Sequence, residues 1–548
     1  MGGSPFLIPP MASASSPSSE PNPTNHAIGT RIVSTSFWLI LQEIADLALA
    51  FTFTWIALRR YGPTYFGLIT LTQAVLNLSS LPTLNLEQAL IRLIPEFQSS
   101  GYWRTARWLV KTIVTVKFSL AILFSTALFG FSPLISSILK IPELIEMIRI
   151  GCISILFAAL TEVGAATALG VLQPQYRTFT ITIRRIIEVS LLIYFSSNRI
   201  HPADGILALA LADMIAASTY WILLTRLLRS RPRSTETFSR RELLKRAGEY
   251  ALPLYGARLT EIFGREIGKL FLGRLASATA VGYYSVARLA TERIQSLLSQ
   301  APLASVPVIA STNPDRSEPQ NLQQKNQATL GLLKYQLIAA TMIAIILSAI
   351  APWMIQFLGS NEYAEAIPVF RMLIIGMVFW GATATLHALF LINERTIGIL
   401  YLNSALIVST VIPYMLFIRP MQAFGAAISD SIGQIVTYAI ALFLVAKFFQ
   451  FPTRVAFKQN MQLIATAGLL CTPFFVLPEK LFIQVIALSL VLFLYVTILL
   501  GAQFLPANLW EQVSNLKIPL PLVNRLIVTG ARGLQMYQNW LLRTKVWG

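Results

Sequence analysis

The sequence predicts an all-α, polytopic membrane protein of about 14 transmembrane helices, and three observations lead to this fold class. Hydrophobic residues make up 55% of the 548 residues and charged residues only 12%, whereas soluble domains carry about 25% charged residues. The mean hydropathy is +0.62, so most of the chain lies in apolar segments. Many of these segments reach the length of about 20 apolar residues that a helix needs to cross a bilayer.

The predicted spans fall into two sets of six and a final pair. An N-terminal six-helix bundle occupies residues 31–225, a C-terminal six-helix bundle residues 250–450, and two additional transmembrane helices residues 451–505. Two six-span halves joined by a linker are typical of transporters, in which the halves rock about a central site. The spans are predicted near 32–58, 66–86, 108–131, 144–172, 178–197, 205–225, 250–273, 282–306, 333–357, 367–391, 396–418, 424–449, 461–477 and 481–505.

The distribution of Lys and Arg orients these spans. An even number of spans places both termini on one side, and the loops of that side hold most of the basic residues, so the positive-inside rule predicts that both termini are cytoplasmic. The linker 226–249 contributes more of these basic residues than any other connection. We interpret it as a topology anchor, as a surface that attracts anionic lipid headgroups, or as both. Its basic residues are Arg226, Arg229, Arg231, Arg233, Arg240, Arg241, Lys245 and Arg246.

Both ends of the chain are predicted to lie outside the bilayer. Residues 1–30 are rich in Ser and Pro and lack the basic segment and cleavage site of a signal peptide, so they predict a disordered tail. Met11 is an alternative start to Met1. Residues 506–548 predict a cytoplasmic tail, in which Arg alternating with Leu, Trp and Tyr is compatible with an interfacial helix or with disorder.

Charged residues inside the seventh span are the strongest indication of a site. Arg258, Glu261, Arg265 and Lys269 recur every three or four residues, which places them on one helical stripe with Glu266 beside it. Each charge that faces lipid at the centre of a span costs about 2.5–3.5 kcal/mol. The stripe therefore has to face water or partner charges, and we expect a central aqueous cavity.

The eighth and first spans carry further candidates. Arg288 and Glu292 form a stripe in the eighth span with Arg293 nearby, and Glu43 and Asp46 lie one turn apart in the first. One hypothesis is that the basic stripes bind the pyrophosphate of a lipid carrier, since guanidinium groups suit phosphate oxygens. The alternative is that Arg258–Glu261, Glu261–Arg265 and Arg288–Glu292 only neutralise one another. Glu43 and Asp46 are candidates to bind a coupling proton or sodium ion, or simply contact water.

Other polar residues in the spans are predicted to have structural roles. Arg184, Arg185 and Glu188 are expected to extend toward the cytoplasmic face. Asp213, His387 and Asp430 are expected to form hydrogen bonds between helices. Cationic residues concentrated in one half and acidic residues in the other predict a cavity with divided charge.

Several classes of function are excluded by the same residues. The net charge of +18 favours nucleic acid only in a chain with a large hydrophilic domain, and none is present here. Two cysteines in apolar runs and three scattered histidines predict no disulfide framework, metal site or cofactor. No Asp-x-Asp pair and no large external loop are present, so a membrane enzyme of glycan assembly lacks candidate catalytic residues.

Three motifs resemble the polysaccharide-export family of Wzx-type flippases. In the first half, Arg59, Gly62, Pro63, Phe66 and Gly67 are similar to the turn that follows the first helix of that family. The second half carries two more motifs, GKLFLGRLASATAVGYYSVARL and FLGSNEYAEAIPVFRMLIIG. The family's usual Asp in the first of these is absent, and the segment with Arg265, Glu266 and Lys269 takes its place, which favours anion binding over ion carriage.

The resemblance, which runs from about residue 32 to 450, implies a function as well as a fold. It implies V-shaped paired bundles of the multidrug, oligosaccharidyl-lipid and polysaccharide exporter superfamily. It also implies a flippase that translocates undecaprenyl-pyrophosphate-linked oligosaccharide across a bacterial inner (plasma) membrane by alternating access, for O-antigen or exopolysaccharide synthesis. The expected partners are this lipid-linked substrate, membrane lipids, and the glycosyltransferases and polymerase of the same pathway. A peptidoglycan lipid II flippase and a multidrug or ion antiporter of the same superfamily remain alternatives.

Overall fold

The computed structural model is helical throughout the part of the chain that it describes. That part comprises residues 23–81, 85–99, 102–198, 200–229, 240–311, 319–393, 395, 397–478, 480–502, 504, 529, 531 and 533–539. Eight of the helices in these ranges are long and apolar enough to cross a membrane by length and composition. The all-α membrane fold is therefore confirmed, while the count of fourteen spans stays a prediction.

The first group of helices holds the predicted N-terminal spans. Its six helices are α1 (Pro23–Ser80), α2 (Glu87–Ser99), α3 (Trp103–Leu139), α4 (Leu144–Gly170), α5 (Pro174–Asn198) and α6 (Asp204–Arg229). Helix α1 consists of two helices that meet at Gly62, whose φ of 71° lies in the left-handed region. Glycine reaches this conformation at no steric cost, and Pro63 then begins the second half with a fixed φ. The two halves of α1 correspond to the first and second predicted spans.

The second group is built in the same way. It contains α8 (Ala278–Ser311), α9 (Pro319–Gly359), α10 (Ala366–Ile392) and α11 (Ile397–Phe449), with the short 3-10 helix η2 (Asn361–Tyr363) before α10. Helix α11 also consists of two halves, which meet at Gln422 with a φ of 49° shortly after Pro420. The predicted spans near 396–418 and 424–449 lie on these two halves.

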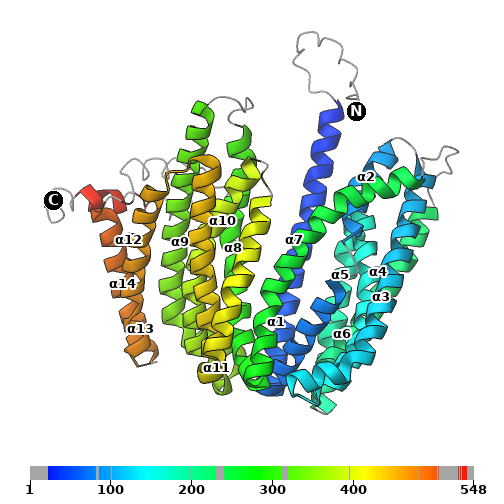
Figure 1. Cartoon of the computed structure of the whole chain (residues 1–548), viewed down its shortest axis with the longest axis horizontal. Helices are drawn as coiled ribbons and strands as arrows, with labels where there is room; N and C mark the ends of the chain where they lie inside the picture. Colours follow the sequence, from blue (N-terminus) through cyan, green and yellow to red (C-terminus); the bar gives the residue numbers. More distant parts are fainter. Residues whose placement is uncertain are drawn as a thin grey trace, which may run out of the picture.

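Helix α7 (Arg240–Leu275) connects the two groups. Near its start, Leu243 and Ala247 are buried in an apolar cluster with Phe97 of α2 and Trp103 of α3. Further along, α7 packs against α11 and α8 of the second group. Figure 1 shows this green helix crossing from the ends of α2 and α3 toward the place where the groups meet.

Several boundaries differ from those predicted. Helix α1 begins at Pro23 inside the predicted tail, and the linker 226–249 is helical at both ends, where α6 reaches Arg229 and α7 starts at Arg240. Residues 230–239 and 1–22 lie outside the described part. Helix α2 has no counterpart among the predicted spans, because its 13 residues extend only about 20 Å and cannot cross a bilayer.

The last helices pack on the outer side of the second group. Helices α12 (Thr453–Cys471) and α14 (Leu481–Gly501) contact α9, and the single turn α13 (Pro473–Val476) joins them. Of the predicted tail 506–548, residues 529, 531 and 533–539 are described, and there Ala531 packs against Leu500.

The two groups together form a V (Figure 1). They meet where the second half of α1 crosses the start of α8. A Cβ on Gly67 would lie 1.8 Å from the carbonyl oxygen of Ala278, and one on Gly282 would lie 2.1 Å from that of Pro63. Hydroxyl pairs Thr64–Thr279, at 2.9 Å, and Ser285–Thr70, at 3.0 Å, add polar contacts. The arms of the V diverge toward the end at which α1, α2 and α7 begin.

Candidate functional site

Three adjoining cavities lie between the arms of the V and in its two walls. The inner cavity, of about 400 Å³, is lined by residues of α1, α4, α5, α6, α7 and α8. The mouth cavity, of about 640 Å³, is lined by α2, α3 and α7 together with the second half of α1, the end of α4 and the start of α5. The side cavity, of about 430 Å³, is lined by α7, α8, α10 and α11. Shared lining residues connect them, for example Glu162, Arg265 and Arg288.

The predicted stripe of α7 faces these cavities. Arg258 and Arg265 line the mouth cavity, and Lys269 lines the inner cavity. The Glu261 carboxylate accepts hydrogen bonds from both arginines, with N–O distances of 3.3 Å to Arg258 and 2.9 Å to Arg265. One carboxylate thus serves two guanidinium groups, which leaves a surplus positive charge on this part of α7.

Glu266 and Lys269 form a neutral pair one turn further along α7. Their N–O distance is 2.7 Å, and Glu266 also accepts from the amide of Asn77 at 2.9 Å. The Glu266 side chain is only 4% exposed. A buried carboxylate with both a charge partner and an amide donor is well stabilised, so the pair contributes to the cavity wall without adding net charge.

Helix α8 contributes Arg288 to both the inner and side cavities. Its guanidinium donates hydrogen bonds to the carboxylates of Glu292 and of Asp430 on α11, with N–O distances of 2.9 Å and 3.1 Å. Asp430 also accepts from the hydroxyls of Tyr284 and Tyr414. Asp430 therefore connects helices as predicted, and does so through an ion pair as well as hydrogen bonds.

Several predicted candidates are placed less centrally. Arg293 is exposed and lines none of the three cavities. Glu43 is exposed on α1. The Asp46 carboxylate accepts a hydrogen bond from Arg185 at an N–O distance of 2.6 Å, so it already forms an ion pair. The Nε2 atom of His387 is buried and has no hydrogen-bond partner in the described part of the chain.

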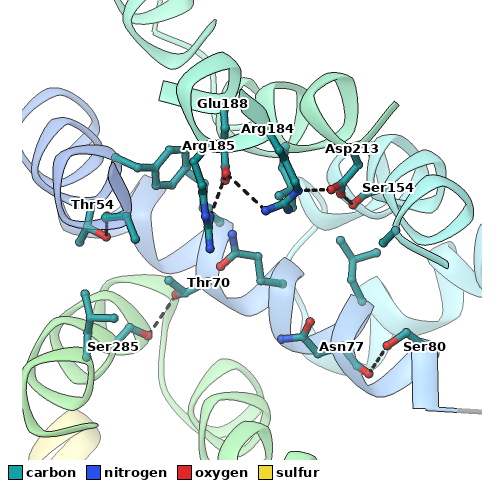
Figure 2. Close-up of a pocket in the computed structure, with 18 of the residues that line it drawn as sticks. Thr54, Thr70, Asn77, Ser80, Ser154, Arg184, Arg185, Glu188, Asp213 and Ser285 are labelled. Carbon is teal, nitrogen blue, oxygen red and sulfur yellow. Dashed lines mark hydrogen bonds and ion pairs between the residues drawn. The ribbon is translucent and has the colours of Figure 1, made fainter. Parts of the chain in front are cut away.

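The structure corrects the prediction that Arg184 and Arg185 extend toward the cytoplasmic face. Both line the inner cavity, because acidic partners inside the N-terminal group hold them there. Figure 2 shows Glu188 between them, 2.8 Å from Arg185 and 3.9 Å from Arg184. Arg184 also pairs with Asp213, which accepts a further hydrogen bond from Ser154 (Figure 2).

A second buried cluster was not identified from the sequence. Lys117 of α3 is 1% exposed and lies 2.6 Å from Glu87 of α2 and 2.5 Å from Glu162 of α4. A lysine this far inside the apolar run of α3 was a usable signal, since a charge there needs a partner. Its partners lie 30 and 45 residues away, and nothing in the local pattern points to them.

The charges that line the cavities are balanced overall. Their described lining residues include eight acids, Glu87, Glu162, Glu188, Asp213, Glu261, Glu266, Glu292 and Asp430. They include eight cations, Lys117, Arg177, Arg184, Arg185, Arg258, Arg265, Lys269 and Arg288. The expected division into a cationic and an acidic half is therefore wrong, because each wall pairs its own cations. The mouth cavity has a surplus of only one positive charge among its described lining residues, which include four cations, Lys117, Arg177, Arg258 and Arg265, and three acids, Glu87, Glu162 and Glu266.

The arrangement suits binding and passage of a polar group. Amide, hydroxyl and charged side chains face the cavities, whereas large apolar side chains are exposed elsewhere on the same helices, such as Leu123 and Phe131 of α3. Within the described residues, no three His, Cys, Asp or Glu side chains are grouped to hold a metal ion.

Comparison with protein families gives one match that covers more than half of the chain. The profile of a family described as polysaccharide biosynthesis protein matches residues 58–368. The sequence matches no curated protein at a significant level.

Comparison with solved structures gives the same fold. A lipid II flippase MurJ in an inward closed conformation matches with a TM-score of 0.62 at 14% identity, covering 86% of this chain and 100% of that one. An inward-facing multidrug resistance MATE family transporter of the MOP superfamily matches with a TM-score of 0.56 at 15% identity, covering 76% and 95%. The MATE multidrug transporter DinF-BH matches with a TM-score of 0.53 at 14% identity, covering 77% and 96%.

Proposed function

Because the chain belongs to the polysaccharide biosynthesis protein family, we propose that it is a flippase for undecaprenyl-pyrophosphate-linked oligosaccharides. It moves these lipids across the bacterial inner membrane by alternating access and so supplies the assembly of a surface polysaccharide such as O-antigen or exopolysaccharide. Both termini lie in the cytoplasm. The glycosyltransferases that build the lipid-linked unit and the polymerase that consumes it act before and after this step.

The observation that carries the proposal is the polar cavity between the arms of the V. A sugar headgroup cannot cross the hydrocarbon core unless its hydrogen-bonding groups are satisfied, and the cavity walls offer amides, hydroxyls and charges for this. The three cavities adjoin one another from the open end of the V to the crossing of α1 and α8. The polyprenyl chain remains among the lipids, where apolar helix surfaces face it.

The charge distribution supports an anionic headgroup that enters by the mouth cavity. With the termini in the cytoplasm, this cavity opens toward the side on which the lipid-linked unit is made. Arg258 and Arg265 share a single carboxylate there, so one positive charge is free to meet phosphate oxygens. Arginine suits this role because its planar fork donates two parallel hydrogen bonds.

A lipid II flippase is the second candidate, and one observation favours it. The structural match to a protein of that name covers all of that chain, and here α12 and α14 follow the second group of helices. A drug antiporter has less support, because the acids of the cavity that would bind a cationic drug are already paired with Arg or Lys. Depletion of the protein separates the first two, since arrest of peptidoglycan synthesis supports the lipid II function.

Substitution on α7 tests the leading proposal. We expect Arg258→Ala and Arg265→Ala each to lower the export of the surface glycan, and the double variant to abolish it, with protein abundance unchanged. Both arginines are partly exposed, so their removal leaves no buried charge unpaired. Export is measured by glycan blotting and by flipping of the lipid-linked unit in proteoliposomes.

Lys269 needs a different variant from the two arginines. Lys269→Ala alone would leave the buried Glu266 without its cation, which destabilises a protein by about 3–5 kcal/mol. The paired change Glu266→Gln with Lys269→Met removes both charges together and keeps their volume. Normal flipping in the Arg258 and Arg265 double variant would refute an anion site on α7.

A further inference from the structure

The side cavity differs from the other two cavities in the sign of its charge. Its described lining residues include three acids, Glu261, Glu292 and Asp430, and two cations, Arg265 and Arg288. The mouth cavity instead has one cation more than it has acids, and the charges of the inner cavity balance. The negative surplus of the side cavity disfavours an anionic occupant and favours a neutral or basic one.

The pairing inside the side cavity reinforces this preference. Arg288 donates hydrogen bonds to both Glu292 and Asp430, with N–O distances of 2.9 Å and 3.1 Å. One guanidinium group therefore serves two carboxylates here, the reverse of the arrangement around Glu261 at the mouth cavity. A phosphate in the side cavity would have to displace a carboxylate from this guanidinium group, whereas an uncharged group with many hydroxyls would not.

Uncharged amides from two different helices face the same space. Gln295 of α8 and Gln434 of α11 line the side cavity, and neither side chain has a hydrogen-bond partner within the described residues. Each amide offers both donors and an acceptor, which matches hydroxyl groups that also donate and accept. The cavity volume of about 430 Å³ lies in the range of small-molecule sites.

Trp380 of α10 adds an aromatic surface to these amides. Its neighbours Phe379 and Ala382 are buried, whereas Trp380 is partly exposed and lines the side cavity. Its indole N–H has no hydrogen-bond partner in the described part of the chain. The face of an aromatic ring is negative and attracts the C–H face of a sugar, while the hydroxyls at the edge of the sugar remain free to meet amides.

We propose that the side cavity binds one neutral sugar residue of the lipid-linked oligosaccharide, which stacks on Trp380 and bonds to Gln295 and Gln434. This proposal rests on the flippase function proposed above and names the part of the substrate that this wall recognises. The side cavity adjoins the mouth cavity at Arg265 and the inner cavity at Arg288, so a sugar bound there stays joined to a headgroup outside it. A uronic acid is a poor occupant, because its carboxylate meets the negative surplus.

Binding of lipid-linked sugars to the full-length protein in nanodiscs tests this subsite. The probes are undecaprenyl pyrophosphate and its derivatives with glucose, galactose, glucuronic acid or galacturonic acid, and native mass spectrometry measures their affinities. Each neutral sugar differs from its uronic acid only in a hydroxymethyl group that becomes a carboxylate. We expect a neutral sugar to raise the affinity above that of undecaprenyl pyrophosphate by about tenfold, and its uronic acid to give no gain.

Variants assign this gain to the side cavity. Trp380→Ala is expected to lower the affinity for the neutral-sugar lipid by about tenfold and to leave that for undecaprenyl pyrophosphate unchanged. Trp380→Phe keeps a ring without the N–H and should recover part of the gain. Gln434→Leu removes the amide and should lower the gain several-fold. The matched control is Trp353→Ala, a partly exposed tryptophan of α9 that lines none of the three cavities.

The outcomes separate this inference from the proposed function. If Trp380→Ala and Gln434→Leu both keep the full gain, or if neither neutral sugar gives a gain in the wild type, the subsite is wrong, and normal flipping leaves the flippase function standing. If the uronic acid lipids bind as tightly as their neutral counterparts, selection of uncharged sugars is refuted. If the wild type neither binds nor flips any pyrophosphate lipid, both proposals fail. Unchanged affinity of each variant for undecaprenyl pyrophosphate shows that a lost gain is not a loss of fold.

Discussion

At the scale of single residues, the buried Lys117 cluster determines how the N-terminal group holds together. Lys117 connects α3 to Glu87 of α2 and to Glu162 of α4. Glu87 is nearly as buried as the lysine, whereas Glu162 is 57% exposed toward the cavities. Loss of the lysine therefore leaves one carboxylate without water or a cation.

We expect Lys117→Met to lower the free energy of unfolding by about 3–5 kcal/mol, the cost of leaving a buried charge unpaired. Thermal unfolding in detergent, followed by tryptophan fluorescence, measures the effect. Lys111→Met, at an exposed position of the same helix, is the matched control and should be near neutral. Adding Glu87→Gln to Lys117→Met should recover most of the loss, and equal stability of the Lys117 and Lys111 variants would contradict the role of the cluster.

The sequence predicted some of these residues and not others for a physical reason. Arg258, Glu261 and Arg265 lie within one helix, so helical spacing alone predicted that they share a face and offered their pairing as one alternative. Pairs such as Lys117–Glu87 and Arg184–Asp213 join different helices. Their partners depend on how helices pack, which a single sequence does not reveal.

At the scale of elements, the crossing of α1 and α8 depends on two glycines. Gly67 and Gly282 allow the backbones to approach so closely that a methyl group on either would overlap a carbonyl oxygen. Thr64 and Thr279 lie side by side at the same crossing. The crossing closes the end of the V opposite the mouth cavity, and the alternating access proposed above would require it to separate.

A cysteine pair at Thr64 and Thr279 reports this closure. In a variant with Cys152 and Cys471 replaced by Ala, we expect Thr64→Cys with Thr279→Cys to form a disulfide under mild oxidation. Adding Gly67→Ala should lower the yield several-fold, because the methyl group forces the helices apart. Gly331→Ala, which meets open space in α9, should leave the yield unchanged; a yield insensitive to Gly67→Ala would show that the approach of the helices is not limiting.

Helix α7 contacts both groups, and its first turns test that attachment. Leu243 is buried against α2 and α3, whereas the adjacent Leu244 is 47% exposed. Leu243→Ala removes buried apolar volume at a cost of about 2–5 kcal/mol. We expect hydrogen exchange in these turns to become about tenfold faster or more, while Leu244→Ala exchanges as the wild type does. Equal exchange in both variants would mean that α7 is held elsewhere.

At the scale of the whole molecule, composition and motifs predicted the fold class and the family correctly. A sufficiently long apolar run is expected to form a membrane helix, because a helix satisfies its backbone hydrogen bonds within the segment. Helix α2 was missed because it is short and amphipathic, and its apolar residues Leu90, Ile94 and Phe97 are buried against other helices. The cavity was predicted from the cost of the α7 charges, but its balance of charge depends on residues from both walls.

That balance determines how a voltage across the membrane acts on the molecule. Moving one elementary charge through 100 mV involves about 2.3 kcal/mol of electrical work. The described lining residues of the empty cavities include eight cations and eight acids, so the alternating access proposed above would move no net charge from them. If the substrate is the pyrophosphate lipid proposed above, its binding makes the cavity anionic, so an inside-negative voltage would do work only on the loaded protein and in the outward direction.

The Thr64 and Thr279 cysteine pair makes this consequence measurable in vesicles with a potassium diffusion potential. We expect disulfide yield to be independent of voltage without substrate and to fall at inside-negative voltage when undecaprenyl pyrophosphate is bound. Glu162→Gln removes one exposed acid and leaves Lys117 paired with Glu87. The empty variant then carries one extra positive charge, and inside-negative voltage should raise its yield. The charge balance of the cavity would thus set which half of the transport cycle the cell's own voltage drives.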